Sequence, residues 1–337
     1  MEKQEIINKN RIIYVLKGLA ILSVISAHCG NRYELNSVTT VMNQLLSCFG
    51  TIGVPVFFLL SGYLFHNTKK IADILKSKFT GIVVPWIATG LLIWLYETLK
   101  KGIVYSGNPV AWLLGIGNYL WYLPVLICYF LVFYFVRSKK TAVLVLVLGL
   151  AYHIFRYDCR FAFLEIDSRY EILNNILCQL PFFSLGFLIQ KTESFDKCIL
   201  FFKKKKIFWT LISTIIICCA LYVNKGSIYY NSQFFLIYAL GFIILFLILA
   251  LTISAGIENL LVQTGKVSFF IYLVHMPIAG LISNIFSRVD VLLYFVFLQP
   301  LITLGILLAF TRFIALVGRK WNLKYFYKVV GLNEKIQ

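Results

Sequence analysis

Residues 11–28 read RIIYVLKGLAILSVISAH, an apolar stretch in which Lys17 and His28 are the only charged or imidazole side chains after Arg11. A helix needs about 20 apolar residues to cross the hydrocarbon layer of a membrane. Backbone N–H and C=O groups find no water in that layer, so such a run favours a helix, which satisfies them internally. The run Ile12–Cys29 therefore predicts a first membrane-spanning helix.

Nine further apolar runs follow along the 337-residue chain, too continuous for alternating barrel strands. They are Leu45–Phe65, Gly81–Leu99, Tyr119–Val136, Thr141–Phe155, Ile172–Gln190, Ile207–Val223, Phe234–Ile253, Val267–Phe286 and Val291–Val317. The last is long enough to tilt or to continue along the membrane surface. Only 14% of the residues are charged, whereas soluble domains carry about 25%. The sequence predicts an all-α integral membrane protein, a bundle of about ten transmembrane helices.

The 32 Lys and Arg residues are distributed unevenly along the chain and give a formal net charge of +18. If the N-terminus is cytoplasmic and ten helices alternate, most of them fall in inner segments, as the positive-inside rule requires. These segments include Lys76, Lys78 and Lys266. We therefore expect both termini in the cytoplasm and a multi-pass protein of the cytoplasmic membrane. The partners of this charge are then membrane lipids, with Lys203–Lys206 at anionic headgroups, and no nucleic acid.

No linker, repeat or low-complexity tract divides the chain, so residues 1–337 are expected to form a single membrane domain without an appended soluble domain. Residues 1–11 are polar, and no small-residue cleavage site follows the first run, so no cleavable signal peptide is expected. The eight Cys residues show no metal-ligand spacing, and Cys218 and Cys219 are adjacent. The sequence therefore predicts neither a metal site nor a disulfide framework.

Lys17 and His28 are the strongest functional candidates, because ionisable side chains are costly in a bilayer and usually mark a functional site. Their spacing in a helix is three turns plus about 20°, so they share a face about 16 Å apart along the axis. They could act on two ends of one long ligand. Lys17 would attract a phosphate, and neutral His28 would take a proton from a hydroxyl. Alternatively, Lys17 snorkels to the inner headgroups and His28 lies in the outer interface.

Two other stretches combine helix-shaping residues with polar side chains. Residues 53–64 read GVPVFFLLSGYL, where Pro55 can kink a helix and Ser61 and Gly62 allow a helix or a ligand to approach closely. Helix packing alone would explain the same residues. Residues 120–124 read LWYLP and place Tyr122 in an aromatic pair beside Pro124, which also suits a membrane interface.

A third stretch, residues 265–277, reads GKVSFFIYLVHMP. Ser268, Tyr272 and His275 fall on one helical face, and a polar face on a membrane helix points into the bundle. We expect His275 to lie deeper than His28 and to support the site rather than to act as its base. His66 and His153 are interpreted as interface residues.

These stretches resemble acyltransferase family 3, a family of multi-pass membrane acyltransferases. The family carries a basic residue, ten residues and then a His regarded as catalytic, as Lys17 and His28 do. Residues 53–64, 120–124 and 265–277 resemble its later landmarks in family order, and residues 181–187, PFFSLGF, are a weaker match. The family commonly has an Arg-x-x-Arg pair before its third helix. Here Lys78-Phe-Thr-Gly81 keeps one basic residue and loses the second, and Lys76 is expected to compensate.

The resemblance implies transfer of an acyl group, most often acetyl, from cytoplasmic acyl-CoA to a hydroxyl of an extracytoplasmic polysaccharide or glycolipid. Acyl-CoA would be a donor substrate, and no permanently bound cofactor is expected. The donor would be held by Lys17, Lys76 and Lys78 in a channel through the bundle. The supporting residues would be Ser61, Tyr122, Ser268, Tyr272 and His275.

In this mechanism His28 deprotonates the acceptor, and the alkoxide attacks the thioester. Tyr122, Ser61 and Tyr272 are candidates for stabilising the oxyanion, and Glu34 for orienting His28. An acyl-histidine intermediate is an alternative to direct transfer. The charged outer segment Arg156–Glu171 would bind a polar acceptor or be a solvated loop. Two other functions fit the same residues, a transporter of a lipid or sugar intermediate and the membrane part of a larger complex.

Overall fold

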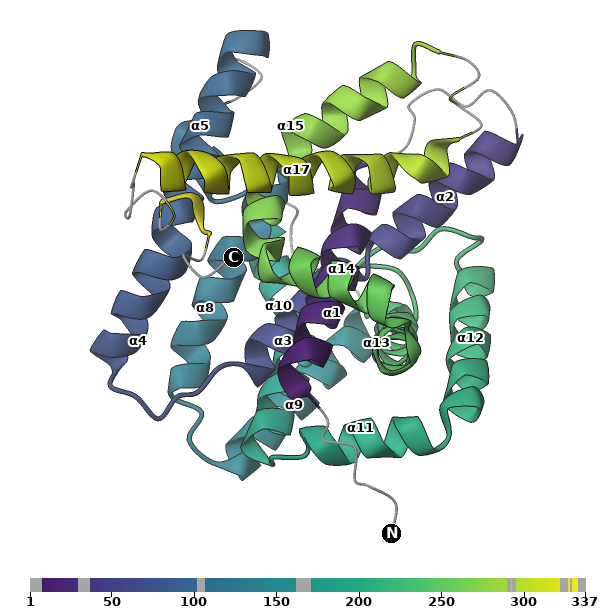
Figure 1. The fold of residues 1–337 in the computed structure, drawn as a ribbon. Coiled ribbons are helices and arrows are strands. Elements are labelled where there is room, and N and C mark those ends of the chain that lie inside the picture. The colour runs from purple at the N-terminus through teal and green to yellow at the C-terminus, as the bar shows by residue number, and fades with distance from the viewer. Residues whose placement is uncertain are drawn as a thin grey trace.

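The computed structural model describes residues 8–29, 37–101, 107–161, 171–289, 292, 295–321, 327 and 329–332, and every regular element in these ranges is helical (Figure 1). The longer helices are α1 (Lys9–Ala27), α2 (Ser37–Gly50), α3 (Gly53–Tyr63), α5 (Val84–Lys101), α8 (Tyr122–Tyr134), α9 (Lys139–His153), α10 (Glu171–Lys191), α12 (Lys206–Val223), α13 (Phe235–Thr252), α15 (Ser268–Phe286) and α17 (Gln299–Lys320). The shorter helices and helical turns are α4 (Ile71–Lys78), η1 (Phe79–Val83), α7 (Pro109–Leu113), η2 (Tyr119–Trp121), η3 (Ile154–Asp158), α11 (Phe195–Lys204), α14 (Ala255–Lys266) and η6 (Val296–Leu298).

Within these residues, nine helical segments are long and apolar enough to cross a membrane, and a tenth, Tyr119–Tyr134, is shorter. The nine are Lys9–Ala27, Thr39–Tyr63, Ile71–Lys100, Lys139–Asp158, Glu171–Lys191, Lys206–Val223, Phe235–Thr252, Ser268–Phe286 and Val296–Lys320. Each of the ten predicted runs coincides with one of these segments. The expectation of an all-α integral membrane protein is confirmed.

Three segments interpreted as inner loops are instead helical. The third span begins at Ile71 rather than Gly81, because α4 continues through the π-helical turn η1 into α5. Lys76 and Lys78 are therefore helical residues of this span. Hydropathy did not predict this extension, because α4 is amphipathic and not continuously apolar, with Ile74 buried and Lys76 exposed. The second segment holds α11, which ends at Lys204, and the third is α14, which ends at Lys266.

Helix α1 lies at the centre of the bundle and packs against α14, α3, α2, α15, α13 and α17 (Figure 1). Its closest neighbours approach through glycines. A Cβ atom on Gly18 would overlap the carbonyl oxygen of Leu261 in α14, and one on Gly265 would overlap that of Tyr14. A Cβ atom on Gly53 of α3 would overlap the carbonyl oxygen of Ala20. Small residues thus bring two helices against the backbone of α1, as they commonly do in membrane bundles.

Glycines also allow close contact between α3 and α10, which pack along much of their length. A Cβ atom on Gly62 would overlap the carbonyl oxygen of Phe183, and one on Gly186 would overlap that of Leu59. Both glycines belong to stretches that the sequence singled out. Helix packing therefore explains Gly62 and Gly186, and the neighbouring Ser61 is left for another role.

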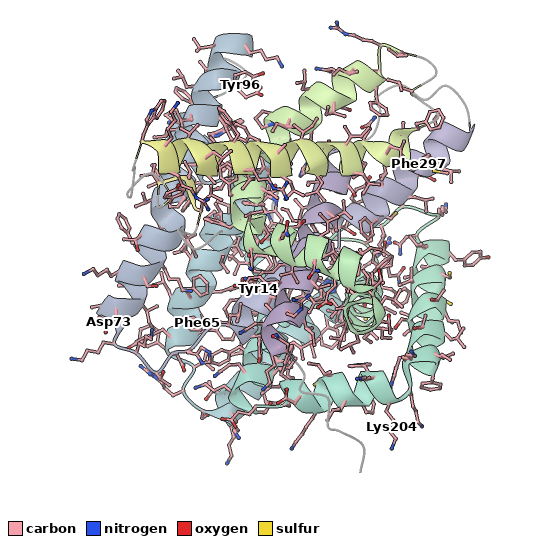
Figure 2. All side chains as sticks on the ribbon, in the orientation of Figure 1. Tyr14, Phe65, Asp73, Tyr96, Lys204 and Phe297 are labelled. Atoms are coloured by element: carbon pink, nitrogen blue, oxygen red, sulfur yellow. The ribbon has the colours of Figure 1, made fainter. Side chains whose placement is uncertain are left out.

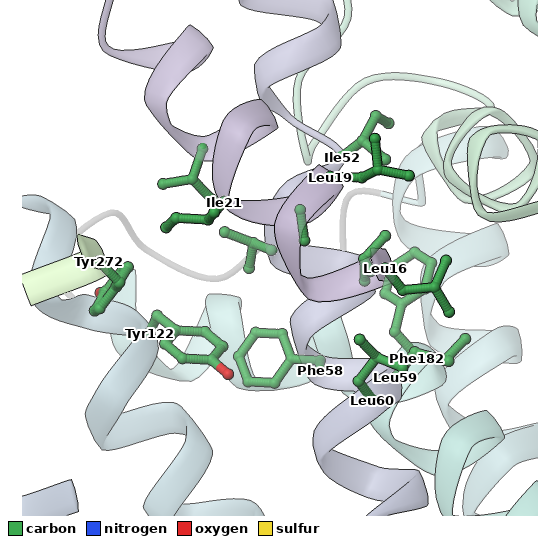
Figure 3. Packing of buried hydrophobic residues seen from close by; sticks show 14 of the residues in the cluster. Leu16, Leu19, Ile21, Ile52, Phe58, Leu59, Leu60, Tyr122, Phe182 and Tyr272 are labelled. Atoms are coloured by element: carbon green, nitrogen blue, oxygen red, sulfur yellow. The ribbon is translucent and has the colours of Figure 1, made fainter. Parts of the chain in front are cut away.

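Aromatic rings fill the space between α3, α8 and α15. The Tyr122 ring lies 4.6 Å from that of Phe58 and 5.4 Å from that of Tyr272, measured between centroids. Figure 3 shows Tyr122 between these two side chains, below α1. This packing fixes the start of α8 against α15, which determines the positions of the polar groups described below.

Several basic segments gather at one end of the bundle. Figure 1 places the start of α1, the chain ahead of α4, and α11 at this end, and Lys204 of α11 lies at the periphery in Figure 2. These segments carry Lys9, Lys69, Lys70 and the run Lys203–Lys206. The grouping agrees with the predicted segregation of basic residues. The cytoplasmic location of this end stays a prediction.

Helix α17 crosses the bundle at a steep angle to α8 and α12 (Figure 1). It packs against α15 and α1. The sequence allowed this tilt, because the last apolar run is longer than a perpendicular span requires.

The glycine contact between α14 and α1 predicts a specific loss of stability. Gly265→Ala places a methyl group on the Tyr14 carbonyl and should lower the free energy of unfolding by about 1–3 kcal/mol or more, as overpacking does. Gly256→Ala is the matched control on the same helix, because a Cβ atom there meets nothing within 4 Å. It should be neutral or stabilising, since Ala favours helix over Gly. Unfolding curves in detergent measure both, and equal effects would contradict this packing.

Candidate functional site

A cavity of about 300 Å³ lies between α1, α3, η1, α8 and α15. Six side chains that the sequence singled out line it: Lys17, Ser61, Lys78, Tyr122, Ser268 and Tyr272. The other residues lining the cavity are mostly apolar: Val24, Val54, Phe57, Leu64, Gly81, Ile82, Leu126, Phe130 and Phe269. Five helical segments therefore bring their polar residues to one partly open cavity between the helices.

Two ammonium groups dominate the electrostatics of this cavity. The Nζ atom of Lys78 lies 4.1 Å from the centroid of the Phe130 ring, and that of Lys17 lies 5.8 Å from the Tyr14 ring. No carboxylate is among the described lining residues, and the ion pairs found in the described part of the chain involve neither Lys. Two half-buried cations that share a space without a described counter-ion favour an anionic ligand.

The cavity is elongated along the helices. It follows α1 from Lys17 to Val24, which is about 10 Å of helix. Lys78 and Phe130 mark one end, whereas Val24 lies one helical turn, about 6 Å, from His28. A long ligand with its charge at the Lys78 end would therefore extend toward His28, although neither His28 nor His275 is among the lining residues.

The hydroxyl groups of the cavity differ in what they can offer a ligand. Ser61 Oγ and Tyr122 Oη lie 3.4 Å apart and share one hydrogen bond, so one of their two hydrogens stays available. Tyr272 donates its only hydroxyl hydrogen to the Tyr119 carbonyl at 2.5 Å, and Ser268 donates to the Gly265 carbonyl at 2.9 Å. The Ser61 and Tyr122 pair thus keeps one hydrogen for a ligand at the Lys17 end of the cavity, whereas the hydroxyl hydrogen of Tyr272 is already donated.

His28 follows the last residue of α1 and meets His275 of α15. The two ring centroids are 5.1 Å apart with an angle of 49° between the planes. His28 is half-buried, and His275 is fully buried. The structure therefore brings together two His residues that the sequence placed at different depths.

The expectation that His275 lies deeper than His28 stays a prediction. The structure adds that the two rings are in contact, because α15 starts inside the bundle beside Tyr14. Helix α14 crosses α1 between Arg11 and Gly18, with Arg11 Nε 2.6 Å from a carboxylate oxygen of Glu258 (Figure 1). The chain enters α15 beside Tyr14, inside the bundle. The ten residues from Gly265 to His275 then rise about 15 Å, which brings the backbone of His275 within about one helical turn, about 6 Å, of the level of His28. The two side chains span the rest, since their rings are in contact.

Tyr119 is a residue of this site that the sequence analysis missed. Its ring lies 5.0 Å from that of His275 at an angle of 81°, and its hydroxyl donates to the Leu273 carbonyl at 2.7 Å. That carbonyl lacks its usual helical donor, because Pro277 has no N–H. The Tyr119 hydroxyl, on another helix, takes the place of that donor. In the sequence, Pro277 indicated that the Leu273 carbonyl needs a partner from outside its own helix.

Lys76 is the candidate donor-binding residue that the structure does not bring into the cavity. It is exposed and lines a neighbouring apolar groove of about 350 Å³ between α4 and α8, which shares Lys78 and Phe130 with the cavity. Lys76 does not replace the missing second basic residue inside the cavity. Gly81, at the position of that lost residue, lines the cavity.

The remaining candidates lie elsewhere. His66 is exposed, 2.9 Å from Gln190 Nε2, as an interface residue would be. His153 is instead fully buried against Tyr157 and Phe235, so its placement at the interface was wrong. Glu34 lies outside the described residues, as do residues 162–170 of the charged outer segment.

Comparison with known families gives one match. The model of acyltransferase family 3, described as an acyltransferase domain, matches residues 10–317. The match runs from the start of α1 into α17 and includes all of the residues that line the cavity. No curated protein and no solved structure matches the chain.

The hydrogen bond from Tyr119 to Leu273 predicts a coupling with Pro277. Tyr119→Phe leaves the Leu273 carbonyl unsatisfied and should cost about 0.5–2 kcal/mol of unfolding free energy. In a Pro277→Ala background, the restored N–H can satisfy that carbonyl, so the same change should cost less. Tyr222→Phe, at a side chain that is 87% exposed, is the control and should cost nothing. An equal cost of Tyr119→Phe in both backgrounds would contradict this account.

Proposed function

The chain belongs to acyltransferase family 3 and is a multi-pass membrane acyltransferase, and we propose that it moves an acetyl group from cytoplasmic acyl-CoA to a hydroxyl of an extracytoplasmic polysaccharide or glycolipid. The observation that carries this proposal is the elongated cavity with two ammonium groups toward one end and His28 one turn beyond the other. Its length and charge fit a donor whose phosphates and reactive thioester are separated by a flexible arm.

The charged end of the cavity suits the phosphates of coenzyme A. Lys17 and Lys78 would each form charge-assisted hydrogen bonds with phosphate oxygens. In the proposed complex the ligand supplies the negative charge that no described lining residue provides. The apolar walls between Lys78 and Val24 would then surround the pantetheine arm.

The transfer itself would take place at His28. A neutral ring nitrogen of His28 takes the proton of the acceptor hydroxyl, and the oxygen attacks the thioester carbonyl carbon. The carbonyl oxygen becomes an oxyanion. The C–S bond then breaks, and the thiolate leaves with the proton that His28 carries. The Ser61 and Tyr122 pair lies toward the Lys17 end, because Gly53 of α3 meets Ala20 and Val24 and Ser61 follows about 12 Å further along α3. Its free hydrogen would bond to the pantetheine arm rather than to the oxyanion.

Family membership favours this enzymatic function over the transporter interpretation, and one assay separates the two. Inside-out vesicles that contain the protein receive acyl-CoA labelled in its acyl group, and the label is measured in glycan or glycolipid. The wild type should transfer the label. His28→Ala should reduce transfer by about 10²–10⁴-fold, the contribution of a general base.

His66→Ala is the matched control for this assay, because His66 is exposed and does not line the cavity. It should transfer label at the wild-type rate. Unchanged transfer in His28→Ala would eliminate His28 as the base. Absence of transfer in the wild type across a panel of surface glycans and glycolipids would contradict the proposed function.

The charged end of the cavity predicts a defect in donor affinity. Lys17→Met and Lys78→Met should each raise the KM for acyl-CoA about 10- to 100-fold, because each removes a charge-assisted contact worth about 1.5–3 kcal/mol. Arg at either position should recover part of the loss. Lys140→Met, which removes an exposed charge at the start of α9, is the control. If all three Met variants had the same KM, the donor would bind elsewhere.

A further inference from the structure

The two His rings at the end of α1 are placed so that they can share a hydrogen bond. Their centroids are 5.1 Å apart. Two imidazole rings joined by an N–H···N bond of about 3 Å have centroids roughly 5.2 Å apart, since each nitrogen lies a little over 1 Å from its centroid. The two rings are therefore at the spacing that such a bond requires, and the bond forms when a ring nitrogen of half-buried His28 turns toward Nε2 of His275.

The nitrogens of His275 identify which atom would accept this bond. Nδ1 lies 2.6 Å from the Tyr272 carbonyl oxygen, which can only accept, so Nδ1 carries the proton. Nε2 of the neutral ring is then an acceptor. It is fully buried and has no hydrogen-bond partner among the described residues. An unpaired buried acceptor is costly, and native structures rarely leave one without a role.

The surroundings hold His275 in this orientation. Tyr119 donates to the Leu273 carbonyl, and Tyr272 donates to the Tyr119 carbonyl, so two hydrogen bonds join η2 to α15 on the N-terminal side of His275. The Tyr119 ring also packs edge-on against the His275 ring. The Nε2 atom is thus presented on a rigid element, which is what a group that orients another side chain requires.

We propose that His275 is a positioning residue, whose Nε2 accepts a hydrogen bond from one ring nitrogen of His28 and thereby leaves the other nitrogen of His28 unprotonated to act as the base. This inference rests on the proposed acyl transfer at His28. During that step the acceptor proton moves to the free nitrogen of His28, while His275 stays neutral and stabilises the imidazolium through the shared bond. When the thiolate leaves with the proton, His28 returns to its starting tautomer.

A neutral acceptor suits this place in the fold. An isolated carboxylate in the bundle would need to be desolvated, which costs far more than burying an imidazole. The two hydrogen bonds of His275 instead use the carbonyl of Tyr272 and the N–H of His28. The arrangement orients the base without placing a permanent charge beside it.

Two substitutions separate this role from helix anchoring. In His275→Asn the side-chain amide can reach the position of Nδ1 and bond to the Tyr272 carbonyl, but it cannot reach His28. In His275→Gln the side-chain amide reaches the position of Nε2 and can accept from His28. The proposal predicts that kcat falls about 10²–10⁴-fold in Asn and stays within about 10-fold of wild type in Gln. The KM for acyl-CoA should be unchanged in both.

The vesicle assay with labelled acyl-CoA measures these values, and unfolding curves confirm that both variants fold. Equal activity of Asn and Gln, or higher activity of Asn, would overturn the positioning role and leave helix anchoring. A rise in KM with an unchanged kcat would also overturn it. Because wild type and His28→Ala are assayed together, failure of this inference is distinguishable from failure of the proposed function, in which the wild type itself transfers no label.

Discussion

The close contact between α1 and α14 determines the geometry of the site. Gly18 and Gly265 let the two backbones meet, so α14 crosses α1 inside the bundle and delivers the chain to α15 beside Tyr14. From that point α15 runs in the same direction as α1. Ser268 then faces the cavity with Lys17, and His275 lies opposite His28. A side chain larger than hydrogen at either glycine would move α15 and separate these pairs.

The polar groups inside the bundle are divided between two levels. The lower level holds two cations and no described carboxylate, an arrangement that favours an anionic ligand. The upper level holds two imidazoles and the hydrogen bonds of Tyr119 and Tyr272 to backbone carbonyls. Charge is thus kept at the end where a charged donor would enter, and neutral groups lie where the chemistry would take place. Tyr272 connects the levels, since its ring lines the cavity and its carbonyl holds His275.

Much of this could be predicted from the sequence. Hydropathy located all ten apolar helices, because a span of the right length has few alternatives in lipid. The helical repeat placed Lys17 and His28 on one face, and the residues singled out in the sequence include the six Lys, Ser and Tyr side chains that line the cavity. The sequence did not show the contacts between distant elements. Residues 255–266 are polar enough to resemble a loop, so the sequence did not show that α14 starts α15 beside Tyr14 and brings His275 against His28.

The contacts of individual side chains could not be predicted for a different reason. Burial of His153 and the distance of Lys76 from the cavity depend on how neighbouring helices are rotated, which a single sequence does not encode locally. Tyr272 was a candidate hydrogen-bond donor to the oxyanion. Its hydroxyl instead donates to the carbonyl of Tyr119, 153 residues away. Such pairings between distant elements become visible only in the folded chain.

The most direct test of the account is an experimental structure of the protein in a lipid nanodisc with a non-transferable thioether analogue of acetyl-CoA. The account predicts phosphate oxygens within about 4 Å of the Lys17 and Lys78 ammonium groups. It also predicts that the acyl carbonyl lies next to His28 with room for one acceptor oxygen between them, about 3–3.5 Å from the carbonyl carbon and about 3–3.5 Å from the His28 ring nitrogen. Phosphates bound away from both Lys residues, or an acyl group directed away from His28, would contradict it.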